Sequence, residues 1–128
     1  MTPYDIVESE VLAASSLEES ATSLEHLISG GFAVWDDGSL YSIKQLVGRA
    51  NGLKIEIFAR EHPPPHFHVS GGDIDATFSL VDGSHLEGKV SGRDRALVGW
   101  WYSRSRSLLV RTWNQTRPEN CPVGPIAE

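Results

Sequence analysis

The stretch Asp73-Ile74-Asp75-Ala76-Thr77-Phe78-Ser79-Leu80 alternates polar and apolar side chains with a period of two. Successive side chains of a β-strand point to opposite faces of a sheet, so this period predicts a strand that is apolar on one face only. The same alternation occurs over residues 53–58 and 66–69, and Asp82-Gly83 is typical of a hairpin turn before a further strand at 85–90. These residues therefore predict an antiparallel sheet with one apolar face.

A long helix is expected to follow this sheet. The sequence after Gly92 favours a helix from about residue 94 to residue 115, which ends before Pro118 because proline cannot continue it. Apolar residues recur along it at helical spacing. They are Val98, Trp101, Tyr102, Leu109 and Trp113. The sheet and the amphipathic helix can bury their apolar surfaces against each other, which predicts an α+β fold.

The first fifty residues predict a helix and a short hairpin. Ser16-Leu17-Glu18-Glu19 has the pattern of a capping box, and apolar residues continue at helical spacing to Gly30-Gly31, a typical helix end. Residues 32–35 favour a strand and residues 36–39 a turn, while residues 40–47 fit either a second strand or a short helix. We therefore expect an N-terminal extension over 1–50, a sheet-and-helix domain over 51–117 and a flexible tail over 118–128.

Composition narrows the class of protein. Of the 128 residues, 40% are apolar and 22% charged, which fits one ordinary globular domain and not a disordered chain. No apolar run approaches the roughly 20 residues that cross a bilayer, and the first residues are acidic, so we expect a cytoplasmic protein without membrane contact. The single cysteine, Cys121, excludes an internal disulfide and a cysteine-rich metal site.

Charge is distributed unevenly along the chain. Residues 1–50 have a net charge of −6, whereas residues 93–117 hold six arginines against Asp94. The acidic and basic segments could neutralise each other within one chain. Alternatively, arginines such as Arg104 and Arg106 could bind an outside partner, for which nucleic acid is one candidate because phosphate attracts clustered arginine.

The segment His62-Pro63-Pro64-Pro65-His66-Phe67-His68-Val69 carries the most reactive side chains. The prolines predict a stiff connector that includes His62, and a strand resumes at His66. His66 and His68 are two positions apart on that strand, so we expect both on one exposed face of the sheet, about 7 Å apart. Imidazole is a common metal ligand and a common acid–base group near neutral pH.

Three uses of this face stay open. His66 and His68 could be the catalytic pair of a hydrolase or nuclease. Together with Asp75 they could hold a divalent metal. They could also be surface residues without a specific function, on the solvent face of a sheet whose edge the prolines protect from aggregation. The further candidate binding residues are His62, Glu56, Arg60, Asp75, Arg104 and Arg106.

Several stretches also carry a resemblance to known proteins. They are residues 52–58, residues 62–69, residues 75–78, residues 86–89 and the helix through Trp101 to Trp113. Together they resemble a family of short bacterial proteins catalogued as a domain of unknown function, with the hallmark His-x-Pro-Pro-His-Phe-His-Val. Members are often encoded beside a second small protein in a toxin–antitoxin-like arrangement. The resemblance implies a toxin–antitoxin-like component that acts mainly through protein–protein contact, and residues 1–50 extend beyond the usual start.

Overall fold

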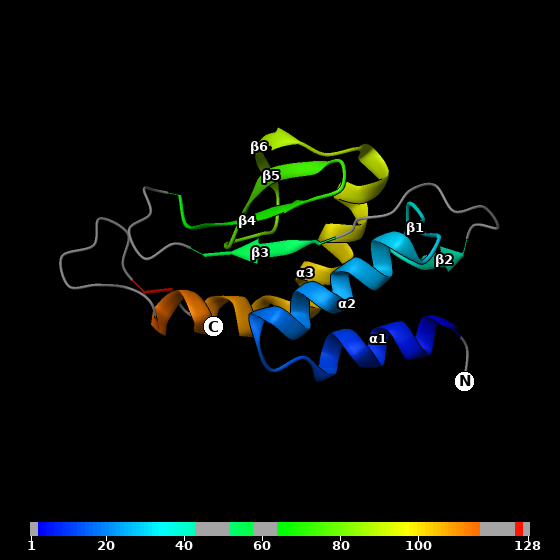
Figure 1. Ribbon diagram of the computed structural model, residues 1–128, viewed down its shortest axis with the longest axis horizontal. Coiled ribbons are helices and arrows are strands. Elements are labelled where there is room, and N and C mark those ends of the chain that lie inside the picture. Colours follow the sequence, from blue (N-terminus) through cyan, green and yellow to red (C-terminus); the bar gives the residue numbers. More distant parts are fainter. Residues whose placement is uncertain (1–2, 43–51, 58–63, 116–124, 127–128) are drawn as a thin grey trace.

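A four-stranded antiparallel sheet forms one layer of the protein (Figure 1). The computed structural model describes residues 3–42, 52–57, 64–115 and 125–126. Neighbours along the chain are neighbours in this sheet, in the order β3-β4-β5-β6. The strands are β3 (Lys54–Glu56), β4 (His66–Gly71), β5 (Ile74–Ser79) and β6 (His85–Lys89).

The helix α3 (Gly92–Gln115) packs on the apolar face of the sheet. Phe67 of β4 is fully buried, with its ring centroid 5.8 Å from that of Trp101 and 5.9 Å from that of Tyr102. All five apolar residues of the predicted helical stripe are buried, as are the four inward residues of the predicted strand 73–80. The prediction of an α+β fold, with a sheet packed against a long helix, is confirmed.

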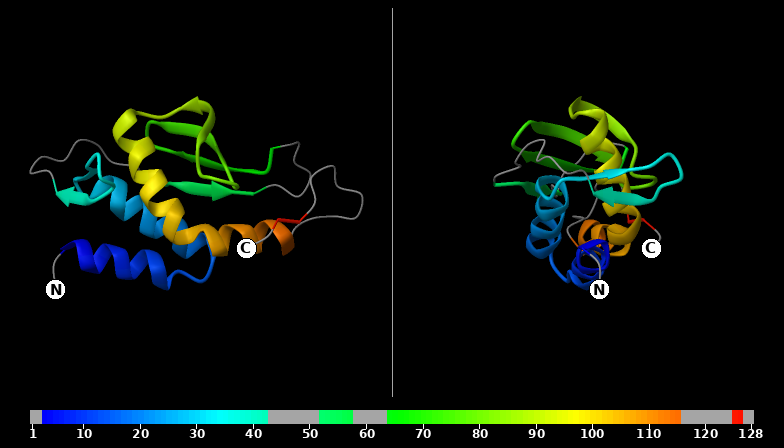
Figure 2. Two further views of the ribbon diagram at one scale, coloured as in Figure 1. Left: turned by 180° about the vertical axis from the view of Figure 1, so that it is seen from behind. Right: turned by 90° about the vertical axis from the view of Figure 1, so that its right-hand side faces the viewer.

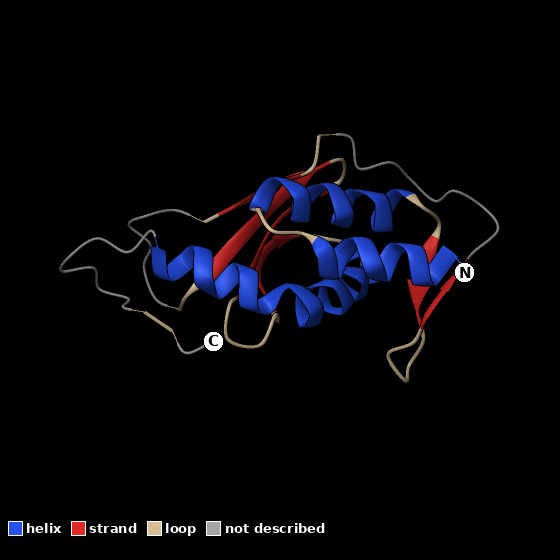
Figure 3. Cartoon of the chain, turned by 90° about the horizontal axis from the view of Figure 1, so that it is seen from below, coloured by secondary structure: helices blue, strands red, loops and turns tan. Residues whose placement is uncertain are grey.

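Two further helices lie on the same side of the sheet as α3 (Figures 2 and 3). In α2 (Leu17–Ser29), the hydroxyl of Ser16 accepts the backbone N–H of Glu19 at 3.1 Å, as the capping pattern predicts. The carboxylate of Glu19 accepts the backbone N–H of Ser15, one residue before the expected donor. The helix α1 (Pro3–Ala13) was not expected, although proline is common at the first position of a helix.

A separate two-stranded hairpin stands at one end of the molecule (Figure 1). It consists of β1 (Phe32–Val34) and β2 (Leu40–Ser42), joined by the predicted turn. Of the two alternatives for residues 40–47, the strand is confirmed as far as Ser42. The rest of that range lies outside the described residues.

One hydrophobic core joins the N-terminal helices to the sheet and α3. Val7 and Val11 of α1 and Leu24 and Leu27 of α2 belong to the same cluster of buried side chains as Phe67.

Most of the expected tail over 118–128 lies outside the described residues. At residue 126, Asn114 exchanges two hydrogen bonds with the backbone of Ile126, at 2.9 and 2.8 Å. Among the helices of the described chain, none is long and apolar enough to span a membrane.

Candidate functional site

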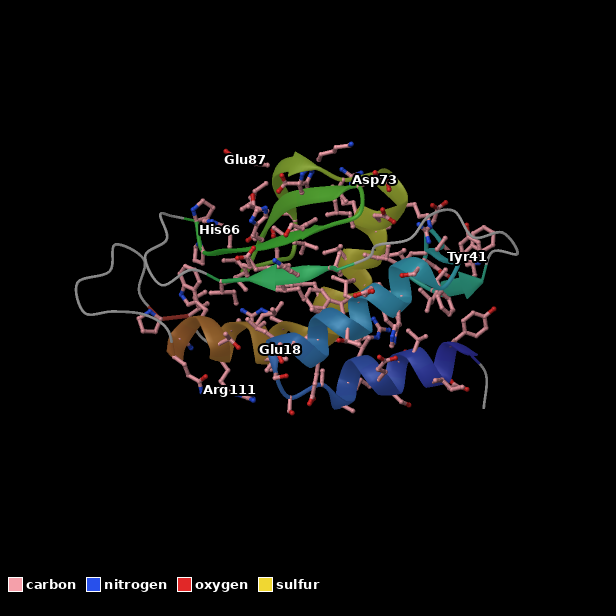
Figure 4. The ribbon with its side chains drawn as sticks, in the orientation of Figure 1. Glu18, Tyr41, His66, Asp73, Glu87 and Arg111 are labelled. Atoms are coloured by element: carbon pink, nitrogen blue, oxygen red, sulfur yellow. The ribbon has the colours of Figure 1, made fainter. Side chains whose placement is uncertain are left out.

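The face of the sheet turned away from the helices is polar, and we call it the outer face. Strand register places Glu56 opposite His68, His68 opposite Thr77, and Thr77 opposite Glu87, so one row of polar side chains crosses all four strands. Figure 4 shows His66 and Glu87 on this side of the sheet. The outer face consists of Lys54, Glu56, His66, His68, Ser70, Asp75, Thr77, Ser79, Glu87 and Lys89.

His68 and Asp75 form the closest polar pair on the outer face. The Nε2–H of His68 donates to Oδ1 of Asp75 at 2.7 Å, and the side chains are 29% and 76% exposed. The two residues come from adjacent strands and are two rungs apart on the β4–β5 ladder, so both project to the same face. A carboxylate at this position orients the imidazole ring. The pair can therefore present a positioned imidazole beside a carboxylate to a molecule at the surface.

His66 differs from His68 in both burial and partner. It is only 8% exposed, and its Nδ1–H donates to the backbone oxygen of Pro64 at 2.8 Å. It lines a hollow of about 250 Å3 together with Pro64, Thr77, Leu86 and Glu87. The expectation that both histidines lie exposed is therefore wrong for His66, because residues of the preceding connector and of β6 surround it.

A bulge in β6 shapes that hollow. Thr77 lies opposite Glu87 and Phe78 opposite His85, so Leu86 is an extra residue on this strand. The backbone of Gly88 has φ 92° and approaches the backbone of Asp75 and Ala76 too closely for a Cβ atom. His85 Nε2 lies 3.0 Å from the backbone oxygens of Glu87 and Gly88. Leu86 and Glu87 were not among the predicted site residues, although an isolated glycine within a predicted strand is a signal of a bulge.

The candidate metal ligands are only partly brought together. His68 and Asp75 meet, whereas His66 turns a ring nitrogen to Pro64. Within residues 3–42, 52–57, 64–115 and 125–126, no three His, Cys, Asp or Glu side chains converge as a metal site. Two protein ligands bind a divalent metal weakly, so a metal at this pair would need further ligands. Arg60 and His62 lie outside the described residues.

The two candidate arginines of α3 contact their own chain. The guanidinium of Arg104 lies 3.9 Å above the ring of Trp100, donates to the backbone oxygen of that residue at 3.0 Å and is 3.5 Å from the carboxylate of Glu8. Burial raises the pKa of Tyr102, and nearby Arg106 opposes part of that rise. The contact between Arg104 and Glu8 agrees with mutual neutralisation of the acidic and basic segments.

The fold and the outer face thus define an α+β protein whose sheet is covered by helices on one side and polar on the other. Residues 52–114 match the model of a family described as "Domain of unknown function (DUF4160)". This segment contains the four-stranded sheet and α3 except for its last residue, and it supports the expected relation to a domain-of-unknown-function family. No curated protein and no solved structure matches the chain.

Proposed function

We propose that this chain is one component of a toxin–antitoxin-like pair and acts mainly through protein–protein contact. Its partner is a small protein encoded by a neighbouring gene, and the contact is made by the outer face. The resemblance of residues 52–113 to small proteins encoded in pairs supports the pairing. The observation that carries the choice of surface is the His68–Asp75 pair, which reaches solvent and whose histidine belongs to a polar row across four strands.

The properties of the outer face suit a contact surface. The sheet holds the backbone of the row rigidly, so little backbone order has to be gained on binding. Glu56, His68 and Thr77 are half-buried, and Glu87 is exposed. These side chains can exchange directed hydrogen bonds with a partner while the helices keep the sheet folded. Polar contacts of this kind give specificity and register to an interface.

Co-expression with the product of the adjacent open reading frame tests the proposal. The tagged chain should copurify with that protein in a fixed ratio, and expression of one member alone should slow growth that the other restores. Replacing both His68 and Asp75 by alanine should weaken the complex by roughly tenfold or more, as expected for loss of a central polar contact. Folding should change little, because both side chains reach solvent.

A matched control is available on the opposite side of the molecule. His26 and Glu10 form another histidine–carboxylate pair, also at 2.7 Å, between α2 and α1. Replacing both of them by alanine should leave the affinity for the partner unchanged. Failure to copurify, or equal weakening by the two double substitutions, would contradict the proposal.

A hydrolase or nuclease is the second candidate function, and the geometry of His68 favours it specifically. An imidazole oriented by a carboxylate is a common general base, since the carboxylate stabilises the charge that forms on proton uptake. The purified chain should then cleave RNA, DNA or a nucleotide, with or without a divalent metal. His68→Ala should abolish that cleavage, whereas His26→Ala should not. Absence of cleavage across these substrates and metals would exclude this candidate.

A further inference from the structure

The β1–β2 hairpin exposes a stacked aromatic pair. The side chains of Trp35 and Tyr41 stack with ring centroids 4.4 Å apart, and Trp35 is 59% exposed. The other three tryptophans of the chain are at most 7% exposed. Tryptophan and tyrosine are the residue types that most often dominate binding energy at protein interfaces, because they offer large rigid surfaces at low entropic cost.

The charge around this pair is negative. Asp36 and Asp37 follow Trp35 directly, and both are exposed. Asp37 accepts the backbone N–H of Ser39 at 2.9 Å, and the hydrogen bonds from Ser39 lower the pKa of Asp37, which keeps this carboxylate ionised near neutral pH. Residues 1–42 contain eight acidic residues and no lysine or arginine. A positively charged partner is therefore favoured by the two carboxylates of the turn and by the acidity of the segment that contains it.

The hairpin is also held firmly at its base. Arg93 of α3 donates from Nε to the backbone oxygen of Phe32 at 3.1 Å and from Nη2 to that of Ile28 at 2.7 Å. The turn is closed by the backbone N–H of Trp35, which donates to Ser39 at 2.8 Å. A preorganised surface loses little conformational freedom when it binds.

We propose that this hairpin is a docking surface for a basic segment of a protein partner. Trp35 and Tyr41 stack against an arginine or lysine side chain of that segment, because the face of an aromatic ring attracts a cation. Asp36 and Asp37 pair with the same charge or with its neighbour. The surface is separate from the outer face, since Tyr41 and His66 lie at opposite ends of the molecule (Figure 4), and it belongs to the region before the matched residues 52–114.

A peptide titration on the full chain tests this proposal. The probe is a short peptide of alternating arginine and alanine. In the wild-type chain the readout is the indole N–H resonance of Trp35 in a two-dimensional NMR spectrum, and in every variant the affinity is measured by titration calorimetry. We expect this resonance to shift on titration. Trp35→Ala, and separately the double change Asp36→Asn with Asp37→Asn, should each weaken peptide binding by about tenfold, the size expected for loss of a stacked cation or its ion pairs.

The control variant also removes two negative charges, but at positions outside the hairpin. Glu18→Gln with Asp73→Asn neutralises two exposed acids on α2 and on the β4–β5 turn, both of which lie apart from Tyr41 in Figure 4. It should change the affinity by less than about twofold, because salt screens interactions between separated exposed charges. The Asp36→Asn with Asp37→Asn variant keeps an amide oxygen at position 37 that can accept from Ser39. It therefore tests the charge with the turn intact, even if Trp35→Ala disturbs the hairpin.

Three results would overturn the proposal. The first is an unshifted Trp35 resonance at saturating peptide. The second is equal weakening by the hairpin and control variants, which would show that general acidity attracts the peptide. The third is self-association of the chain that Trp35→Ala abolishes, which would make a second copy the occupant of this surface.

Discussion

The four-stranded sheet and the N-terminal region bury their apolar side chains in one core, but they present different chemistry to solvent. The outer face of the sheet mixes acids, lysines and histidines, with His68 held by Asp75. The N-terminal region up to residue 42 is acidic and contains no lysine or arginine of its own, and its hairpin exposes Trp35. Stability is therefore shared between the two regions, whereas the surfaces that they expose differ in charge and in side-chain chemistry.

The length of α3 explains why the core is shared. Its 24 residues span about 36 Å, whereas the six residues of β4 or β5 span about 20 Å. Part of the apolar stripe of α3 therefore extends past the sheet. The helices α1 and α2 and the strand β1 supply apolar side chains to the same core, including Leu24 and Phe32.

We expect the largest difference in stability between variants of two tryptophans, one from each region. Trp101→Ala should lower the free energy of unfolding by about 3–5 kcal/mol, because Trp101 is fully buried against Phe67. Trp35→Ala should cost less than about 1 kcal/mol, since Trp35 is largely exposed and stacks on Tyr41 at the surface. Urea denaturation of the two variants measures both values. Equal losses would mean that the hairpin is as integral to the core as α3.

A substitution in α2 tests whether the two regions unfold together. Leu24→Ala in α2 should cost about 2–5 kcal/mol, because Leu24 is fully buried in the shared cluster. Circular dichroism and the fluorescence of the buried tryptophans should report one coincident transition. Two separate transitions would show that the N-terminal region is a unit of its own.

A third comparison is between alanine substitutions of the glycines in the two Asp-Gly-Ser turns. Gly38 and Gly83 both have positive φ, at 87° and 77°, so alanine at either site should cost about 1–2 kcal/mol of conformational strain. At Gly83 the new methyl group would also meet the ring of Tyr102, whereas the space beside Gly38 is open. Gly83→Ala should therefore cost about 1–3 kcal/mol more than Gly38→Ala. Thermal or urea denaturation of the two variants would show this, and equal costs would contradict the tight packing of the β5–β6 turn on α3.

The smallest expected effect is the dependence of stability on pH at the same two turns. Hydrogen bonds from Ser84 lower the pKa of Asp82 below its ordinary 3.8, as those from Ser39 do for Asp37. Each depressed pKa stabilises the fold fully above about pH 3.8, and that contribution is lost as pH falls through the folded-state value. The stability difference between the wild type and Asp82→Ala, or between the wild type and Asp37→Ala, should therefore shrink below pH 3.8. A difference that stays constant down to pH 2 would show that neither carboxylate contributes through its charge.

Local patterns in the chain predicted the elements that depend on neighbouring residues. The period of two over residues 73–80, the capping serine of α2 and the glycine turns each follow from backbone geometry within a few residues. The helical spacing of apolar residues predicted the apolar stripe of α3 in the same way. This stripe and the one-sided sheet together predicted the α+β arrangement. The helix α1 was missed because its buried face offers only Val7 and Val11, too weak a period to stand out.

The candidate site depended on tertiary structure, because strand register and the β6 bulge decide which side chains meet. Alternation placed His66 and His68 on one face, but it carried no information on the covering of His66 or on the pairing of His68 with Asp75. Likewise, the acidity of the N-terminal region was plain in the sequence. Whether Trp35 would be buried in the core or exposed beside Tyr41 was settled only by how the hairpin packs, since a tryptophan suits either environment.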